Sequence, residues 1–181
     1  GNRAWMQTRE PLLHSEVLGT VEGISPIVEE GMSDSASFDN VLEFFVRSGM
    51  SLPHALATLV PESYNDKNPL PAELKSFYEY HSIWMEPWDG PATVIFSDGR
   101  YAGGMLDRNG LRPARYLITK SETMVIASET GVMGFDASQI REKGRLRPGK
   151  ILMVDTEQGR ILQDAEIKAA LAAEHPYLEW L

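Results

Sequence analysis

The spacing of apolar residues changes near Pro91, and this change restricts the fold more than any other feature of the chain. Before it, apolar residues recur at i, i+3, i+4, i+7 and i+8, which is one face of an amphipathic helix. The clearest such face is formed by Phe38, Val41, Leu42, Phe45 and Val46. After it, short apolar runs alternate with turn dipeptides, a pattern typical of antiparallel hairpins. Helices followed by antiparallel strands predict an α+β fold.

Three short helices are expected in the first half of the chain. The first covers Phe38 to Arg47 and ends at Ser48-Gly49, where glycine suits a helix C-terminus. The second begins at Ser51-Leu52-Pro53, since proline in the first turn loses no hydrogen bond. The third opens at Pro71 and places Leu74, Phe77, Tyr78 and His81 on one side. We expect these helices to pack as one layer.

Six strands and a last helix are expected after Pro91. They cover Ala92–Ser97, Arg100–Leu106, Arg115–Thr119, Met124–Ser128, Ile151–Asp155, Arg160–Leu162 and, for the helix, Ala165–Ala173. Asp98-Gly99 predicts a type I′ turn, which needs positive φ at both positions. Gly103-Gly104 lies inside a strand and is expected to permit close backbone packing. The runs Val94–Phe96 and Ile151–Val154 are apolar without alternation, so both faces are expected to be covered. A helix–sheet–sheet–helix stack would provide that cover.

Composition excludes several functional classes. A net charge of -9 argues against binding to nucleic acid, which needs a basic surface. No apolar run approaches the roughly 18 residues of a membrane span. The absence of cysteine excludes disulfides, cysteine-ligated metals and a cysteine nucleophile within the chain. The histidines are His14, His54, His81 and His175. Their scattered positions predict surface or half-buried side chains and no metal site.

The candidate binding residues lie in the segment Gly31 to Ser37. This segment is a glycine followed by small hydroxyl and carboxylate side chains, typical of a loop that caps a helix. Asp34 is therefore expected just before a helix N-terminus, where the backbone N–H groups and the helix dipole stabilise its charge. Such a carboxylate is well placed to bind a cation. The alternative is that Asp34 or a neighbouring serine only caps the helix.

Two further loops are rich in polar groups. The loop Glu86 to Pro91 holds two carboxylates and an indole, which is half of a glycosidase site or, as we favour, a turn with a tryptophan at its edge. In the loop Asp107 to Pro113, Asn109-Gly110 is turn chemistry. Its two arginines could hold a buried aspartate or a substrate carboxylate. We favour a structural role for this loop.

Four segments of the sequence also resemble a known family. They are Gly1–Met6, Ser33–Asn40, Met85–Ala92 and Asp107–Tyr116. Together and in this order they resemble the glutaminase domain of the glutamate synthase large subunit, a class II glutamine amidotransferase. The resemblance covers essentially the whole chain. It implies the αββα four-layer sandwich of N-terminal-nucleophile hydrolases, here in part, which agrees with the stack predicted above.

The resemblance also implies how the chemistry is divided. In that family an N-terminal cysteine attacks the side-chain amide of glutamine, its own α-amino group is the base, and an Asn-Gly pair forms the oxyanion hole. This chain has no cysteine, so these catalytic groups are expected upstream of Gly1, and no residue of the chain is assigned a catalytic role. Asp34 matches the aspartate that binds the α-amino group of the substrate. Ser33 is the second substrate-binding candidate, expected to shape the loop.

The remaining expectations concern the longer protein. Residues 1–163 are expected to be the C-terminal part of the amidotransferase domain, and 164–181 a terminal helix with the start of a linker. Both ends look like cuts within a longer chain, so the fragment alone is expected to be inactive. The family implies FMN and an iron–sulfur cluster in the missing domains, none in this segment. Expected partners are L-glutamine, downstream synthase domains and a small reductase subunit, in the cytoplasm.

Two other assignments remain open at this point. One is a class II amidotransferase domain of another synthase, such as amidophosphoribosyltransferase. The other is a glutamine-binding or interaction module that has lost catalysis. The sequence does not distinguish a pyridine nucleotide from ferredoxin as the electron donor.

Overall fold

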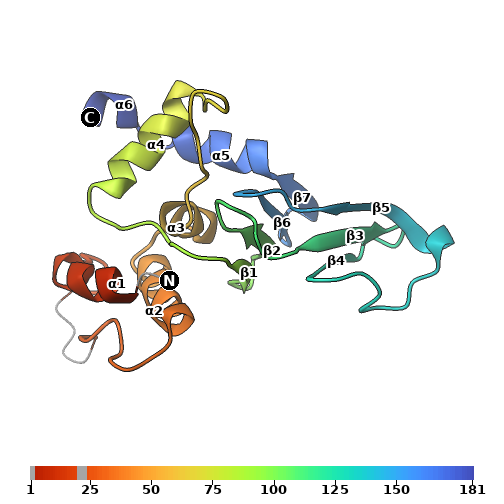
Figure 1. Ribbon diagram of the computed structural model, residues 1–181, viewed down its shortest axis with the longest axis horizontal. Helices are drawn as coiled ribbons and strands as arrows, with labels where there is room; N and C mark the ends of the chain where they lie inside the picture. Colours follow the sequence, from red (N-terminus) through yellow and green to blue (C-terminus); the bar gives the residue numbers. More distant parts are fainter. Residues whose placement is uncertain (1–2, 20–23) are drawn as a thin grey trace. The chain divides into compact units, whose positions relative to one another are not determined.

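A computed structural model describes residues 3–19 and 24–181 of the chain (Figure 1). The chain divides into two compact units. Unit 1 consists of Gly1–Gly90 and Ile167–Leu181, and unit 2 of Pro91–Glu166. The division falls where the apolar spacing changes from helical to extended. None of the helices in the described ranges is long and apolar enough to cross a membrane.

Unit 1 is helical. Its elements are α1 (Arg3–Arg9), the short 3₁₀ helix η1 (Glu10–Leu12), α2 (Asp34–Arg47), α3 (Leu52–Leu59), α4 (Ala72–Ser82) and α6 (Tyr177–Trp180). Helix α5 (Asp164–Ala173) begins in unit 2 and continues in unit 1. The three predicted helices are confirmed as α2, α3 and α4, and α3 contacts both of the others. Helix α6 was not expected from the sequence.

Helix α2 has well-defined ends. The side-chain oxygen of Ser33 accepts a hydrogen bond from the backbone N–H of Ala36 at 3.2 Å. At the other end Gly49 has φ of +99°, and the N–H of Met50 donates to the carbonyl of Phe45 at 3.1 Å. These are the features of a glycine-terminated helix, so the predicted end is confirmed. The predicted start was wrong, because Asp34 is the first residue of the helix itself.

Unit 2 contains two antiparallel sheets. The first has the order β1-β2-β6-β7 and the second the order β4-β3-β5. The strands are β1 (Thr93–Ser97), β2 (Tyr101–Leu106), β3 (Arg115–Thr119), β4 (Met124–Ala127), β5 (Ile140–Arg145), β6 (Ile151–Asp155) and β7 (Arg160–Gln163). The α+β class with antiparallel sheets is confirmed. Strand β5 is not predicted by the sequence pattern.

Two details of the sheets differ from expectation. Only Gly99 of the Asp98-Gly99 pair has positive φ, so the predicted type I′ turn is wrong. The Asp98 carboxylate accepts from the N–H groups of Arg100 and Tyr101 instead, at 2.9 and 2.7 Å. Strand β6 is buried as predicted, but Ile95 in β1 is 60% exposed, so β1 is not covered on both faces.

The core of unit 2 depends on a close approach of β2 and β6. A Cβ atom on Gly103 would lie 2.3 Å from the carbonyl oxygen of Leu152, so only glycine fits there. This confirms the expected packing role of Gly103. The buried core consists of Leu106, Ala114, Leu146 and Leu152, with four partly buried apolar side chains packed against it. Those four are Tyr116, Met124, Ile126 and Ile161.

Candidate functional site

Ser33 and Asp34, the predicted substrate-binding residues, stand together at the N-terminus of α2. Ser33 caps the helix through its hydroxyl, which also lies 3.1 Å from the hydroxyl of Ser35. The buried Ser37 hydroxyl donates to the Ser33 carbonyl at 3.2 Å. Ser33 is therefore engaged in shaping the loop, as the sequence indicated. Asp34 is half-buried in the first turn, where the helix dipole favours an anionic side chain.

The residues before the cap are also held in place. Gly31 has φ of +77°, a conformation that favours glycine. The carbonyl of Met32 accepts a hydrogen bond from the guanidinium of Arg3. The segment around Arg3 therefore contacts the loop that leads into Ser33. Arg3, in the first family-like segment, thus contacts the residue directly before the second such segment.

The loop of Trp88 supports the same end of α2. The Trp88 ring packs edge-on against Phe38 with 5.3 Å between ring centroids, one turn after Asp34. Its indole N–H donates to the Gly90 carbonyl at 2.9 Å, and its backbone N–H donates to the Leu59 carbonyl at 2.7 Å. Trp88 is only 9% exposed, so the prediction of an edge tryptophan was wrong. The ring is a structural support for the first turns of α2.

The glycosidase alternative for this loop gains no support. A glycosidase needs two carboxyl groups that face one substrate bond across several ångströms. Here Glu86 forms an ion pair with Arg9 at 2.6 Å, with both side chains less than a third exposed. This pair ties the loop to the end of α1. A structural role accounts for Glu86.

The loop from Asp107 to Pro113 in unit 2, called the Arg-Pro loop below, is organised around the side chain of Asp107. Asp107 is 1% exposed. One carboxylate oxygen accepts from the N–H of Ala92 at 3.0 Å, and the other from the N–H groups of Asn109 and Gly110 at 2.9 and 3.1 Å. Backbone N–H groups, rather than the two arginines of the loop, satisfy the buried aspartate. This agrees with the structural role favoured from the sequence.

A buried histidine pair in unit 1 was not anticipated. His54 and His81 are 9% and 4% exposed, so the prediction of surface or half-buried side chains was wrong for both. Their Nε2 atoms lie 2.8 Å apart. His81 Nδ1 lies 2.7 Å from the Phe77 carbonyl, and His54 Nδ1 lies 2.8 Å from a Glu174 carboxylate oxygen. The sequence signal available was the place of His81 on the apolar face of α4.

Burial decides the protonation of this pair. It lowers the pKa of His81 to about 4. It also lowers the pKa of His54, although the neighbouring Glu174 opposes that shift. Burial therefore disfavours the charged form of each ring. No group of three or more potential metal-binding side chains occurs among residues 3–19 and 24–181.

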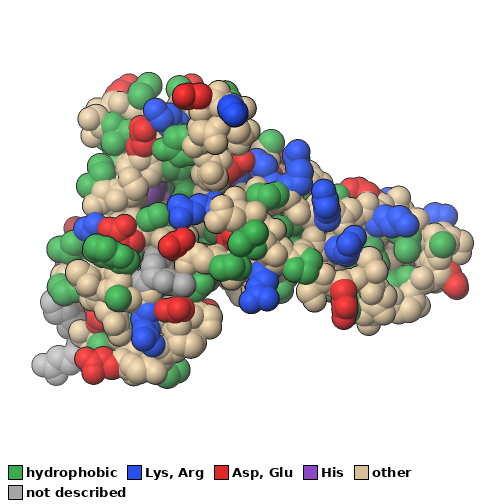
Figure 2. Space-filling view, viewed as in Figure 1, with side chains coloured by type: hydrophobic (Ala, Val, Ile, Leu, Met, Phe, Trp, Pro, Cys, Tyr) green, Lys and Arg blue, Asp and Glu red, His purple; other side chains and the backbone are tan. Residues whose placement is uncertain are grey.

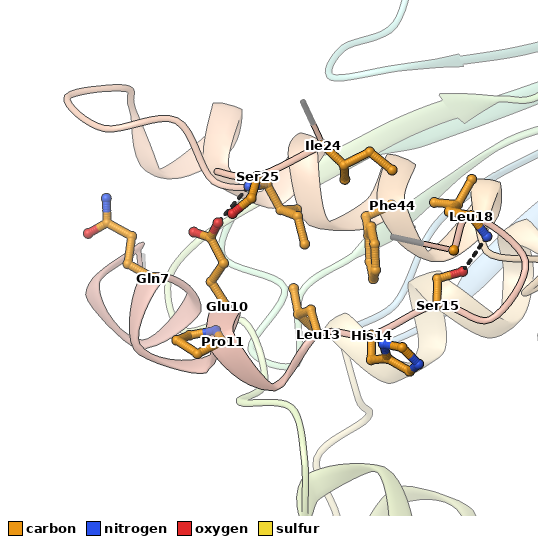
Figure 3. A pocket seen from close by; sticks show the side chains of 12 residues that line it. Gln7, Glu10, Pro11, Leu13, His14, Ser15, Leu18, Ile24, Ser25 and Phe44 are labelled. Atoms are coloured by element: carbon orange, nitrogen blue, oxygen red, sulfur yellow. Dashed lines mark hydrogen bonds between the residues drawn. The ribbon is translucent and has the colours of Figure 1, made fainter. Parts of the chain in front are cut away.

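Two cavities of unit 1 are lined by residues other than Ser33 and Asp34. One, of about 430 Å³, is lined by α1, η1 and the segments that follow them (Figure 3). Its one carboxylate, Glu10, accepts from the backbone N–H of Ile27 at 2.6 Å. Another, of about 650 Å³, has His54, Trp84 and Glu174 on its wall. Neither of these two cavities includes Ser33 or Asp34 in its lining.

Comparison with known proteins identifies the family to which the chain is similar. A family model described as class II glutamine amidotransferases matches residues 1–180. Glutamate synthase (NADH) of Schizosaccharomyces pombe is 48% identical over 184 residues, covering 100% of this chain and 9% of that protein. The large chain of glutamate synthase (NADPH) of Bacillus subtilis is 45% identical, covering 100% of this chain and 12% of that protein. Ferredoxin-dependent glutamate synthase of Cyanidium caldarium is 45% identical with the same coverage. The chain thus spans about a tenth of these relatives.

Proposed function

The chain belongs to the class II glutamine amidotransferases, and we propose that it is part of the glutaminase domain of a glutamate synthase. The proposed reaction is hydrolysis of L-glutamine to glutamate and ammonia, which is then transferred to 2-oxoglutarate. The observation that carries the proposal is the similarity to glutamate synthases along 100% of the chain. The relatives named for NADPH and for ferredoxin are equally similar to the chain, at 45% identity.

Within this reaction the chain supplies substrate binding. We propose that the carboxylate of Asp34 binds the α-ammonium group of glutamine and that Ser33 holds the loop in shape. A half-buried carboxylate at a helix N-terminus supports this role, because the helix favours its ionised form. The contacts of Phe38 with Trp88 fix the helix end one turn away. A fixed carboxylate orients the substrate without losing side-chain entropy on binding.

The nucleophile lies outside these residues, because the chain has no cysteine. We propose that the cysteine and the oxyanion Asn-Gly pair precede Gly1 in the same polypeptide. The thiolate would attack the amide carbon, ammonia would leave, and water would hydrolyse the thioester. The backbone donors of the oxyanion hole would stabilise the developing negative charge. The residues described here position the amino-acid end of the substrate for that attack.

The same proposal covers the organisation of the domain. We propose that residues 1–163 complete a four-layer αββα sandwich with the preceding segment, and that 164–181 lead toward the next domain. FMN and an iron–sulfur cluster would lie in those further domains. Downstream synthase domains and a small reductase subunit would be partners, and the protein would be cytoplasmic.

Ammonia release from glutamine tests the assignment. The assay compares the 181-residue chain with the full-length protein that contains it, and with its Asp34→Asn and Asp39→Asn variants. Asp39 is an exposed carboxylate on the same helix, so its replacement is the matched control. Loss of one charge-assisted contact should lower kcat/KM of Asp34→Asn by about 10- to 100-fold, mainly through KM.

Two results would contradict the proposal. Ammonia from the 181-residue chain alone would require another nucleophile within it. Equal kinetics for the Asp34→Asn and Asp39→Asn variants would remove Asp34 from substrate binding, while leaving the family assignment intact.

A further inference from the structure

The three-stranded sheet of unit 2 carries a row of basic side chains on one face. Residues two apart along a strand share a face, so Arg115 lies with Leu117 on β3, and Lys143 with Arg145 on β5. In the register of the sheet Arg115 is directly opposite Arg145, and Leu117 opposite Lys143. All three basic side chains are exposed. Figure 2 shows Lys and Arg side chains over the part of unit 2 that contains β3, β4 and β5.

These charges have no acidic partners within the described residues. Like charges directly opposite each other in a sheet destabilise it. Elsewhere in unit 2 basic side chains are paired, for example Arg100 with Asp155 at 2.8 Å and Lys150 with Asp164 at 3.0 Å. No ion pair or side-chain hydrogen bond of Arg115, Lys143 or Arg145 occurs in the ranges 3–19 and 24–181. Glu129 lines the same hollow, but it forms no direct ion pair with these side chains in the ranges 3–19 and 24–181.

The basic row borders an apolar hollow of about 550 Å³. Its floor includes Leu117, Val125 and Ala127, which are half-buried. Its rim is the segment that follows β4, where Val132 and Met133 are 54% and 50% exposed. Exposed large apolar side chains that surround a hollow are typical of a surface that binds another molecule.

We propose that this face, defined by Arg115, Lys143, Arg145 and the hollow beside them, binds an acidic polypeptide segment that also carries a large apolar side chain. Aspartate or glutamate side chains of the segment pair with the basic row, and the apolar side chain fills the hollow. Arginine and methionine are enriched in protein interfaces, and complementary charge fixes the register of the partner.

A protein partner fits the charge and composition of the chain better than the other choices. The net charge of -9 repels nucleic acid as a whole, so the local basic row favours a short acidic segment. A small inorganic anion would leave the apolar floor and rim uncovered. The chain also spans only about a tenth of its relatives, so other parts of such a protein are available as partners.

Carbodiimide cross-linking of the full-length protein, followed by peptide mass spectrometry, tests this proposal. The reagent joins a lysine amine only to a carboxylate in direct contact with it, and Lys143 is the one amine of the basic row. We expect a cross-link from Lys143 to an aspartate or glutamate outside Pro91–Glu166. Lys120, exposed at the other end of β3, is the control and should give no such product.

A charge reversal makes the test quantitative. Arg145→Glu should lower the yield of the Lys143 cross-link by about tenfold, since a repulsive contact replaces an attractive one. Arg141→Glu is the matched control, because Arg141 lies on the same strand at the bulge and outside the hollow. Absence of a Lys143 cross-link to any carboxylate outside unit 2 would overturn the proposal. So would a product joining two copies of unit 2, or equal yields from the two charge reversals.

Discussion

Replacement of Asp107 is the sharpest test of how the Arg-Pro loop is held. Its carboxylate accepts three backbone N–H groups in a site that is 1% exposed. The Asp107→Ala change removes both acceptor oxygens and with them three hydrogen bonds. The backbone of residue 107 keeps its own bonds: its N–H donates to the Ala92 carbonyl at 3.1 Å, and its carbonyl accepts from the N–H groups of Gly110 and Gly149 at 3.0 and 2.9 Å. The change therefore leaves the N–H groups of Ala92 and Asn109 without this partner. The loop should therefore stay in place and lose stability, without unfolding on its own.

The size of the loss follows from the number of donors left without partners. A hydrogen bond to a charged group contributes about 1.5–3 kcal/mol, and a buried donor left unpaired costs about 1–3 kcal/mol. Partial access of water to the loop lowers the sum, so Asp107→Ala should cost about 3–5 kcal/mol. Asp107→Asn keeps one acceptor oxygen but turns an amide N–H₂ toward at least one N–H donor. We expect it to cost about 2 kcal/mol.

Urea unfolding at pH 7, followed by far-UV circular dichroism, measures both changes. Asp98→Ala is the control, because Asp98 also accepts two backbone N–H groups but lies in an exposed turn. Its replacement should cost less than about 1 kcal/mol, since water satisfies the released donors. If Asp107→Ala were no more destabilising than Asp98→Ala, the burial argument for the loop would be refuted.

Two further predictions concern buried charges of unit 1. Burial lowers the pKa of His81 to about 4 from 6.5. The unfolded chain therefore binds the extra proton first, so stability is complete above pH 6.5 and is lost as the pH falls. We expect a loss of about 2 kcal/mol between pH 7.5 and 5 in urea unfolding. His81→Gln should flatten that slope, and an unchanged slope would contradict the assignment. Lys168 and Glu62 form a buried pair at 2.6 Å, so Lys168→Met should cost about 3–5 kcal/mol and adding Glu62→Leu should recover most of it. A melting temperature unaffected by Lys168→Met would argue against the pair.

Local signals account for the elements that could be predicted. Apolar spacing and capping residues are both properties of neighbouring positions, so α2, α3, α4 and the β1–β2 hairpin could be read from the sequence. Strand β5 could not, because Ile140–Arg145 carries four charged residues and only one face of it is covered. Its place in the sheet depends on pairing with β3. That pairing joins residues more than twenty positions apart.

The candidate site likewise combines local features, which the sequence predicts, with contacts between distant residues, which it does not predict. The cap and first turn of α2 are local, so Ser33 and Asp34 were placed near a helix start from the sequence. The support from Trp88 is not local, because fifty residues separate it from Phe38 in the chain. The pair of His54 and His81 likewise arises only when α3 and α4 pack together. No spacing rule within a single helix predicts such contacts.

The family-like segments of this chain have different roles, and the burial of their side chains distinguishes those roles. Trp88 is enclosed and supports a helix end, and Asp107 has both carboxylate oxygens occupied by backbone donors. A ligand could reach neither group without breaking the fold around it. Asp34 is half-buried at the start of α2, so part of its side chain remains accessible. Of these three side chains, Asp34 is the one whose place in the structure allows it to bind a substrate ammonium group.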